Sequence, residues 1–420
     1  MTSPHRGTFR SLRGFNYRTW TAGALLSNIG TWMQRVAQDW LVLTQLTQHD
    51  AAAVGVVTTL QFAPQVVLLP LTGFAADHLD RRKLLMATQA SMGALALGLG
   101  LLTVAGVVRL WEVYVFAGLL GCVTAFDSPA RHTFIPELVG EADLSNAVGL
   151  NSTSFNGARM IGPAIAGVVI AAVGTGWVFI VNAVSFVAVL VSLGMLRAEE
   201  IHPSGQAPGA TGGLIDGLRY VWRRPDLKTI LLMLFLVGTF GLNFAIYIST
   251  MAVMVFHAGA DQFGLLTSMM AVGSVVGALL SARRERPRVS LLFVGALVFG
   301  IGFALAAVMP SFWLFGATLV LIGVSAQTFT TTATSAVQLS TEPAVRGRVM
   351  ALLLSVALGG LSLGAPVVGW IANRFGPRSA LVVASASGFA AALVGIYYLM
   401  RYPDLTLVGA VREADVLENE

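Results

Sequence analysis

About a dozen apolar runs, most of them close to 20 residues long, follow one another along the 420-residue chain. A transmembrane helix needs about 20 apolar residues, whereas a barrel strand needs about ten of alternating polarity, a pattern that this sequence lacks. Only 11% of the residues are charged, against about a quarter in soluble domains. The sequence therefore predicts an all-α polytopic membrane protein that is surrounded by the lipid bilayer.

We predict twelve spans in two groups of six. The first group covers residues 19–45, 53–75, 84–106, 113–128, 146–173 and 176–196. The second group covers 229–255, 262–282, 289–309, 312–333, 349–372 and 379–400. The expected domains are an N-terminal segment (1–18), a six-helix bundle (19–196), a linker with an amphipathic interfacial helix (197–227), a second six-helix bundle (228–400) and a tail (401–420).

Positive charge gathers on one side of this layout. Of the 26 Lys and Arg residues, 21 fall on the side of the two termini. Three fall on the opposite side and two, Arg35 and Arg159, fall inside spans. Cationic residues concentrate in cytoplasmic loops, so we expect both termini in the cytoplasm and the chain in the inner (plasma) membrane. The basic balance then needs no nucleic-acid partner.

The two halves of the chain show signs of an internal repeat. Four glycines of the first half fall on glycines of the second half at a constant shift of 202 residues. Such repeats place a substrate path between two bundles. The pairs are Gly121 and Gly323, Gly162 and Gly364, Gly167 and Gly369, and Gly174 and Gly376.

The stretch GFAADHLDRRK joins the second and third predicted spans. Gly73 allows a helix end to pack closely, and Asp77 suits the positive N-terminal end of another helix. Arg81, Arg82 and Lys83 are natural anchors at an anionic membrane surface. A loop that only follows the charge rule explains the cations, but it does not explain Gly and Asp at this spacing.

This stretch resembles the loop 2–3 signature of the major facilitator superfamily, GxxxDxxxRR, with Asp80 where the family commonly has Gly. The stretch ARMIGPAIAG in the fifth span is similar to the antiporter motif GxxxGPxxGG, of which Gly162, Pro163 and Gly167 are kept. FIPELVGEADLSNAVGLNS and VQLSTEPAVRGRV further resemble the branch that includes enterobactin exporters and multidrug efflux proteins.

The resemblance implies the major facilitator fold and a rocker-switch carrier that is usually a monomer. Asp77 would hold an inner gate shut, together with Gly73 and Arg82. Arg81 would pair with an acid at the end of the fourth span, for which Asp127 is the candidate. Many drug/proton antiporters of this superfamily carry an Arg in that span, and residues 113–128 contain none. Proton coupling is therefore expected elsewhere.

The first span carries a polar stripe. At 100° per residue, Asn28, Trp32, Arg35 and Asp39 fall within about 60° of one another. Charges at membrane depth cost at least about 2.5 kcal/mol each, so they contact a cavity or a partner. Either Arg35 and Asp39 form a static pair, or Asp39 takes up a proton during transport while Arg35 stabilises its charged form.

Arg159 lies near or somewhat past the middle of the fifth span, with Asn151 and Phe155 two turns and one turn before it. It is a fixed partner of Asp39 or a part of the substrate path, and both can hold if the pair breaks during the transport cycle. The second half has no charged residue inside its predicted spans, so its cavity candidates are Asn243, Tyr247 and Gln327. Two Arg against one Asp predict a slightly cationic path that suits an anionic or neutral acidic substrate.

We therefore expect a proton-coupled exporter of a drug-like, siderophore-like or other amphipathic small molecule. The alternative is a proton-independent uniporter or an importer on the same scaffold. The six His residues fall near termini or loops and the single Cys has no partner, so neither an enzyme site nor a metal site is expected. No GxxxxGK[ST] motif occurs, so we expect no nucleotide or other cofactor.

Overall fold

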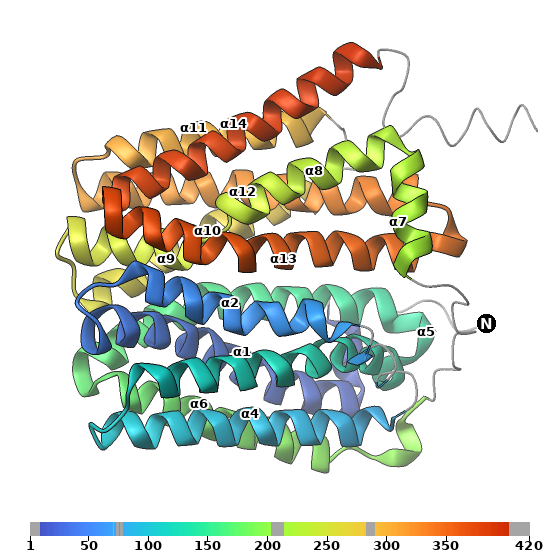
Figure 1. Cartoon of the computed structure of the whole chain (residues 1–420). Helices are drawn as coiled ribbons and strands as arrows, with labels where there is room; N and C mark the ends of the chain where they lie inside the picture. The colour runs from blue at the N-terminus through green and yellow to red at the C-terminus, as the bar shows by residue number, and fades with distance from the viewer. Residues whose placement is uncertain are drawn as a thin grey trace, which may run out of the picture. The chain divides into compact units, whose positions relative to one another are not determined.

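A computed structural model describes residues 9–69, 71–72, 75, 79–202, 214–282 and 290–402 (Figure 1). All the regular elements in these ranges are helical. The helices of the first half are η1 (Arg10–Arg13), α1 (Phe15–Trp40), η2 (Leu41–Leu46), α2 (Ala51–Val67), α4 (Arg81–Val104), α5 (Leu110–Val173), α6 (Thr175–Gly194) and η3 (Ala198–Glu200). Those of the second half are α7 (Leu214–Arg223), α8 (Pro225–Phe240), α9 (Phe244–Thr250), η4 (Met251–Val255), α10 (Ala260–Ala282), α11 (Ser290–Val308), α12 (Phe312–Ser340), α13 (Pro343–Phe375) and α14 (Pro377–Arg401).

Ten helical segments in the described ranges are long and apolar enough to cross a membrane. They include two segments of α5 and the combined segment Pro225–Val255, which joins α8, α9 and η4. The polar helix α1 is not among the ten, and α2 is apolar but has only 17 residues. The all-helical membrane-spanning character that the sequence predicts is therefore confirmed.

The chain divides into two compact units. Unit 1 comprises 1–49, 60–208 and 258–268, and unit 2 comprises 50–59, 209–257 and 269–420. Each unit thus includes a short segment from the other half of the sequence: the first turns of α2 pack in unit 2, and the first turns of α10 pack in unit 1.

The boundary predicted for the fourth span is wrong. We expected that span to end at residue 128, before Pro129, and a connection to follow. Instead α5 continues through Pro129 and Pro136 to a kink at Gly140, which has a φ of 68°. Membrane helices tolerate proline because neighbouring groups satisfy the freed backbone atoms. Arg131, which the predicted layout places in a loop, therefore lies inside a helical segment, Leu110–Gly140, that is long and apolar enough to cross a membrane.

The paired glycines of the predicted repeat pack in equivalent ways in the two units. In unit 1, a methyl group at Gly167 would lie 2.7 Å from the carbonyl oxygen of Ala260, at the start of α10. In unit 2, a methyl group at Gly369 would lie 2.5 Å from the carbonyl oxygen of Ala51, at the start of α2. Each glycine therefore allows α5 or α13 to approach the first turn of another helix closely.

The other glycine pairs show the same equivalence. Gly174 and Gly376 have φ angles of 92° and 91°, which favour glycine because it has no Cβ. They join α5 to α6 and α13 to α14 in the two units. The remaining pairs pack on corresponding helices, Gly121 on α2 and Gly323 on α10, and Gly162 on α1 and Gly364 on α8.

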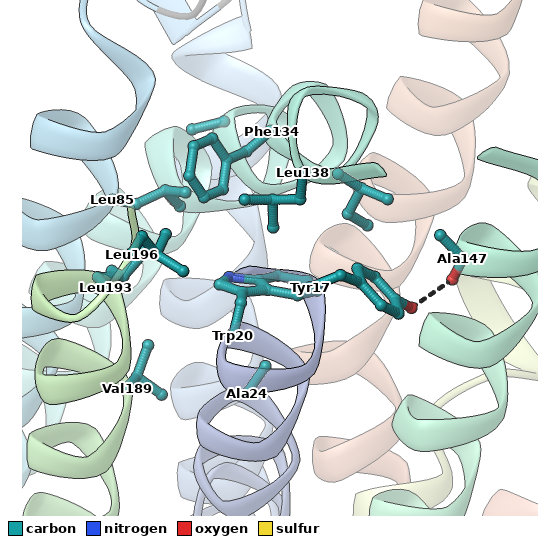
Figure 2. Close-up of a cluster of buried hydrophobic side chains, with 12 residues drawn as sticks. Tyr17, Trp20, Ala24, Leu85, Phe134, Leu138, Ala147, Val189, Leu193 and Leu196 are labelled. Carbon is teal, nitrogen blue, oxygen red and sulfur yellow. Dashed lines mark hydrogen bonds between the residues drawn. The ribbon is translucent and has the colours of Figure 1, made fainter. Parts of the chain in front are cut away.

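A buried apolar cluster holds one end of unit 1 together (Figure 2). Trp20 of α1 lies among Leu85 of α4, Phe134 of α5 and Leu193 of α6. In the same cluster, the hydroxyl of Tyr17 donates a hydrogen bond of 2.7 Å to the carbonyl oxygen of Ala147. Both segments of α5 are thereby fixed against α1, one on each side of the kink at Gly140.

Candidate functional site

The predicted gate lies between α2 and α4. Gly73 and Asp77 are outside the described residues. Asp80 is the N-cap of α4, where its side chain accepts a hydrogen bond of 3.0 Å from the Lys83 backbone. This capping role explains why Asp occupies a position where the loop 2–3 signature commonly has Gly. Arg82 donates to the carbonyl oxygens of Leu193 and Gly194 at the C-terminal end of α6, where a cation is favourable.

The partner predicted for Arg81 is wrong. Arg81 forms an ion pair with Glu137 rather than with Asp127. Glu137 lies ten residues after Asp127 on α5, about 15 Å farther along the helix axis. Because we ended the fourth span at residue 128, we did not consider an acid beyond it.

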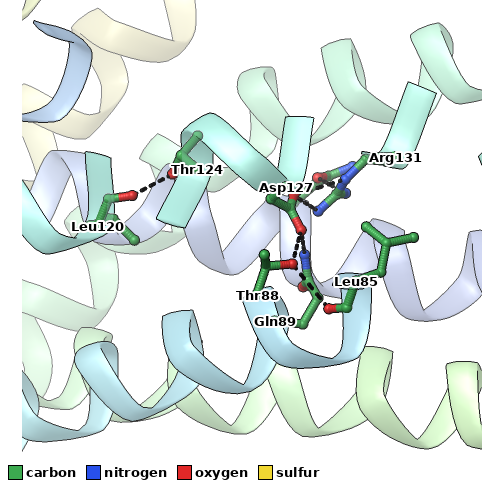
Figure 3. A network of polar contacts seen from close by, with 8 residues as sticks. Leu85, Thr88, Gln89, Leu120, Thr124, Asp127 and Arg131 are labelled. Atoms are coloured by element: carbon green, nitrogen blue, oxygen red, sulfur yellow. Dashed lines mark hydrogen bonds and ion pairs between the residues drawn. The ribbon is translucent and has the colours of Figure 1, made fainter. Parts of the chain in front are cut away.

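Asp127 is instead the centre of a buried polar network (Figure 3). Its side chain lies among α1, α4 and α5, and the residue is only 4% exposed. Thr88 and Gln89 of α4 donate hydrogen bonds of 2.8 and 2.7 Å to Oδ1. Arg131, one turn later on α5, donates to Oδ2 from Nη2 at 3.0 Å and from Nε at 3.3 Å. The carboxylate is therefore fully paired within unit 1.

Arg131 also connects this network to α1. Its Nη1 donates a hydrogen bond of 3.2 Å to Oδ1 of Asn28. The sequence analysis missed Arg131, which lines the cavity described below and binds Asp127. Its spacing of four residues from Asp127 would place both side chains on one helix face, and that signal was present in the sequence once a helix through Pro129 was considered.

A cavity of about 320 Å³ opens in unit 1 beside this network. Asp127 lines it, and so do four other predicted site residues: Asn28, Arg35, Asn151 and Phe155. The sequence analysis did not predict the other polar residues of the wall, which are Thr31, Gln34, Thr124, Ser128, Arg131, His132, Ser152, Asn156 and Asn182. A volume above 300 Å³ and a wall of mixed polarity are typical of small-molecule sites.

The predicted stripe on α1 forms an aromatic and cationic cluster with α5. The guanidinium carbon of Arg35 lies 4.9 Å from the ring centroid of Trp32 and 5.2 Å from that of Phe62. The guanidinium carbon of Arg159 lies 5.4 Å from the same Trp32 ring. Phe155 meets Trp32 edge to face, with 5.8 Å between the ring centroids. The structure thus brings together four residues that the sequence placed on two separate spans.

Neither of the fixed ion pairs that we considered for Asp39 is present in the described ranges. There, Arg35 and Arg159 form no salt bridge, and Asp39 accepts no hydrogen bond. Arg35 lies one turn before Asp39 and is the charged group that acts on it through space. Asp39 is half-buried and lies two residues before the π-helical turn Leu41–Leu46, a type of irregularity that is frequent at functional sites.

The antiporter-like motif forms close helix crossings. A methyl group at Gly162 would lie 2.7 Å from Cβ of Trp32, so this glycine sets the distance between α5 and α1 at the aromatic and cationic cluster. Pro163 lies inside α5, and its carbonyl oxygen approaches Gly264 of α10 in the same unit. Together with the approach of Gly167 to Ala260, these contacts confirm the close packing predicted from the sequence.

The cavity candidates of the second half lie in unit 2. Asn243 is buried at the break between α8 and α9 and donates a hydrogen bond of 2.7 Å to the carbonyl oxygen of Thr239. The buried Tyr247 hydroxyl donates to the carbonyl oxygen of Phe240. Gln327 is half-buried and donates to Thr331 at 2.9 Å. Their part in substrate binding stays a prediction.

Several known transporters are similar to this chain in sequence. The staphyloferrin A transporter of Staphylococcus aureus is 25% identical over 84% of this chain and 89% of its own length. The multidrug efflux pump Tap of Mycolicibacterium fortuitum is 26% identical over 91% of this chain and 95% of its own. The enterobactin exporter EntS of Citrobacter koseri is 26% identical over 87% of this chain and 86% of its own.

The fold is that of solved transporters. A bacterial homologue of the lysosomal transporter Spinster, in an inward-facing and unoccupied conformation, superposes with a TM-score of 0.69 at 15% identity, covering 92% of this chain and 95% of that one. The sequence profile of the transmembrane secretion effector family matches residues 6–410. The chain is therefore a membrane transporter and not an enzyme, and it belongs to the transmembrane secretion effector family of the major facilitator superfamily.

Proposed function

We propose that this chain is a secondary active transporter that exports a small amphipathic molecule in exchange for protons, by alternating access. The three relatives that act on staphyloferrin A, on drugs and on enterobactin support a drug-like or siderophore-like substrate. Of these, the names of the drug pump and the enterobactin carrier specify efflux, which supports the outward direction.

Asp39 is the observation that carries the proton-coupling part of this proposal. A carboxylate inside a membrane segment is costly unless it is paired or has a transport role. In the described residues Asp39 has no hydrogen-bond donor or salt-bridge partner. Arg35, four residues earlier, attracts the Asp39 carboxylate. This attraction is lost when Asp39 gains a proton. Arg159 shares the Trp32 ring with Arg35 and completes the coupling group.

The proposed architecture has twelve spans. We assign α1 and α2 as the two spans beside the ten apolar segments, which gives a six-helix bundle over 19–196 and another over 228–400. We place both termini in the cytoplasm and the transporter in the inner membrane as a monomer. The amphipathic helix α7 then lies on the inner membrane surface, with Trp222 70% exposed.

The inner gate in this proposal is built around the segment before α4. We assign Gly73, Asp77, Arg81 and Arg82 to it, as the resembling family motif implies. The ion pair of Arg81 with Glu137 supports the assignment, because it ties the start of α4 to α5 at the end of a span. Breaking such a pair is one way in which a carrier changes conformation.

Transport into proteoliposomes with an imposed pH gradient tests the proposal. The probes are 2,3-dihydroxybenzoate, an anionic catechol, and ethidium, a lipophilic cation. We expect one of them to accumulate above its equilibrium level in acid-inside vesicles, and the accumulation to stop when nigericin removes the gradient. Movement that only equilibrates the probe, at a rate independent of the gradient, would instead establish the uniporter.

A further inference from the structure

Two guanidinium groups share one indole ring in unit 1. Arg35 and Arg159 lie 4.9 and 5.4 Å from the Trp32 ring centroid. Cation–π contact with tryptophan offsets part of the cost of a cation at membrane depth, but it does not remove the repulsion between two like charges. In the part of the chain that the structure describes, neither guanidinium has a carboxylate in salt-bridge contact.

The charges around the cavity compensate only one of these two cations. Arg131 is neutralised by Asp127 at 3.0 Å. Asp39 is the acid that acts on Arg35, and it balances one of the two cations of the cluster. One positive charge is therefore left over beside the cavity, and an additional anion would offset it.

The surroundings of the cluster also define what such an anion is attached to. Phe155 is 45% exposed, lines the cavity and contacts Trp32 edge to face. Asn151 and Asn156 on α5 add amide groups to the same wall. A flat apolar ring of a ligand can stack beside these aromatic side chains. The oxygens of its acid group can accept two parallel N–H hydrogen bonds from a guanidinium group.

We infer that Arg35 and Arg159, which share the Trp32 ring, bind the anionic group of the substrate, which is an amphipathic organic acid with a flat apolar part. This inference rests on the proposed transport function and names its substrate class. The carboxylate, sulfonate or phosphate of a small molecule would serve equally well. A phospholipid headgroup offers the same anionic chemistry, so the test includes a lipid arm.

A matched pair of probes separates charge from shape. The anion 2-naphthoate and the neutral 2-naphthamide have the same ring and nearly the same size. Their apparent affinities for the purified full-length protein in detergent follow from the rise in its unfolding temperature with probe concentration. No gradient is present, so a failure of proton coupling leaves this measurement unaffected.

We expect the wild-type protein to bind 2-naphthoate at least tenfold more tightly than 2-naphthamide. Arg159→Gln and Arg35→Gln should each reduce this preference to about twofold. Arg159→Lys should keep part of it, because the charge stays and the fork is lost; this variant covers the case in which Arg159→Gln fails to fold. The exposed Arg374, on α13 in unit 2, provides the control Arg374→Gln, which should bind like the wild type.

Equal affinity for the two probes in the wild type would overturn the inference, and so would a preference that survives both Gln substitutions. In the lipid arm, phosphatidylglycerol and phosphatidylcholine are added in place of the naphthalene probes. Stabilisation by phosphatidylglycerol that depends on Arg159, without any preference for naphthoate, would assign the site to a lipid headgroup and likewise overturn it.

Discussion

Arg131 binds the carboxylate of Asp127 from one turn later on α5, with Nη2 at 3.0 Å from Oδ2. Both side chains are largely inaccessible, at 19% and 6% exposed. Because Thr88 and Gln89 complete the shell of the carboxylate, the pair is a structural hub between α4 and α5. Arg131 also donates a hydrogen bond to Asn28. Because both residues line the cavity, the pair also positions one wall of the cavity.

Removing Arg131 should destabilise the protein strongly. Arg131→Ala leaves the buried Asp127 carboxylate without its cation, which typically costs about 3 to 5 kcal/mol. The double variant Asp127→Leu/Arg131→Met removes both charges and should recover most of this loss. Equilibrium unfolding in mixed micelles measures both effects. A double variant that is less stable than Arg131→Ala would contradict the role of this pair as a hub.

The correction of the Arg81 partner gives a cross-linking prediction. In a Cys122→Ser background, which removes the one cysteine of the chain, Arg81→Cys/Glu137→Cys should react with a short bifunctional thiol reagent. Arg81→Cys/Asp127→Cys should not, since Asp127 lies about 15 Å back along α5. Mass spectrometry of the digested protein identifies the linked peptides. The reverse result would restore the pairing that the sequence motif suggested.

Gly162 should be sensitive to any larger side chain. A methyl group there would already lie 2.7 Å from Cβ of Trp32, so Gly162→Val should force α1 and α5 apart at a cost of about 1 to 3 kcal/mol and disturb the aromatic cluster. Gly157→Val on the same helix is a matched control, because a methyl group at Gly157 has nothing within 4 Å. Thermal unfolding and binding of 2-naphthoate measure the two effects, and equal behaviour of the variants would disprove the claim.

The sequence alone predicts the helical membrane fold, the repeat and the grouping on α1. Apolar runs identify membrane helices because the bilayer leaves the backbone few other options. The glycine pairs were detectable because close helix packing restricts a position to small residues. The stripe of Asn28, Trp32, Arg35 and Asp39 follows from helical periodicity alone.

Other parts of the site depend on contacts that the sequence does not contain. The predicted fourth span ends at residue 128, but α5 stays helical through Pro129 and Pro136 to the kink at Gly140. The predicted layout therefore places Arg131 in a loop and leaves Glu137 outside the candidate site. Arg159 of α5 contacts Trp32 of α1. Helical periodicity shows which residues share a face of one helix, but it does not show which faces of two helices meet.

The most direct test of proton-coupled export compares the wild type with Asp39→Asn in proteoliposomes of known orientation. The interior pH is recorded with a trapped dye while a transported probe moves along its gradient. We predict proton movement opposite to the probe in the wild type and its loss in Asp39→Asn. Asp143→Asn, which alters the partly exposed ion pair of Asp143 with Arg10, should behave like the wild type. Probe movement with no proton signal, unchanged in Asp39→Asn, would contradict the account and make Asp39 a structural residue of a uniporter.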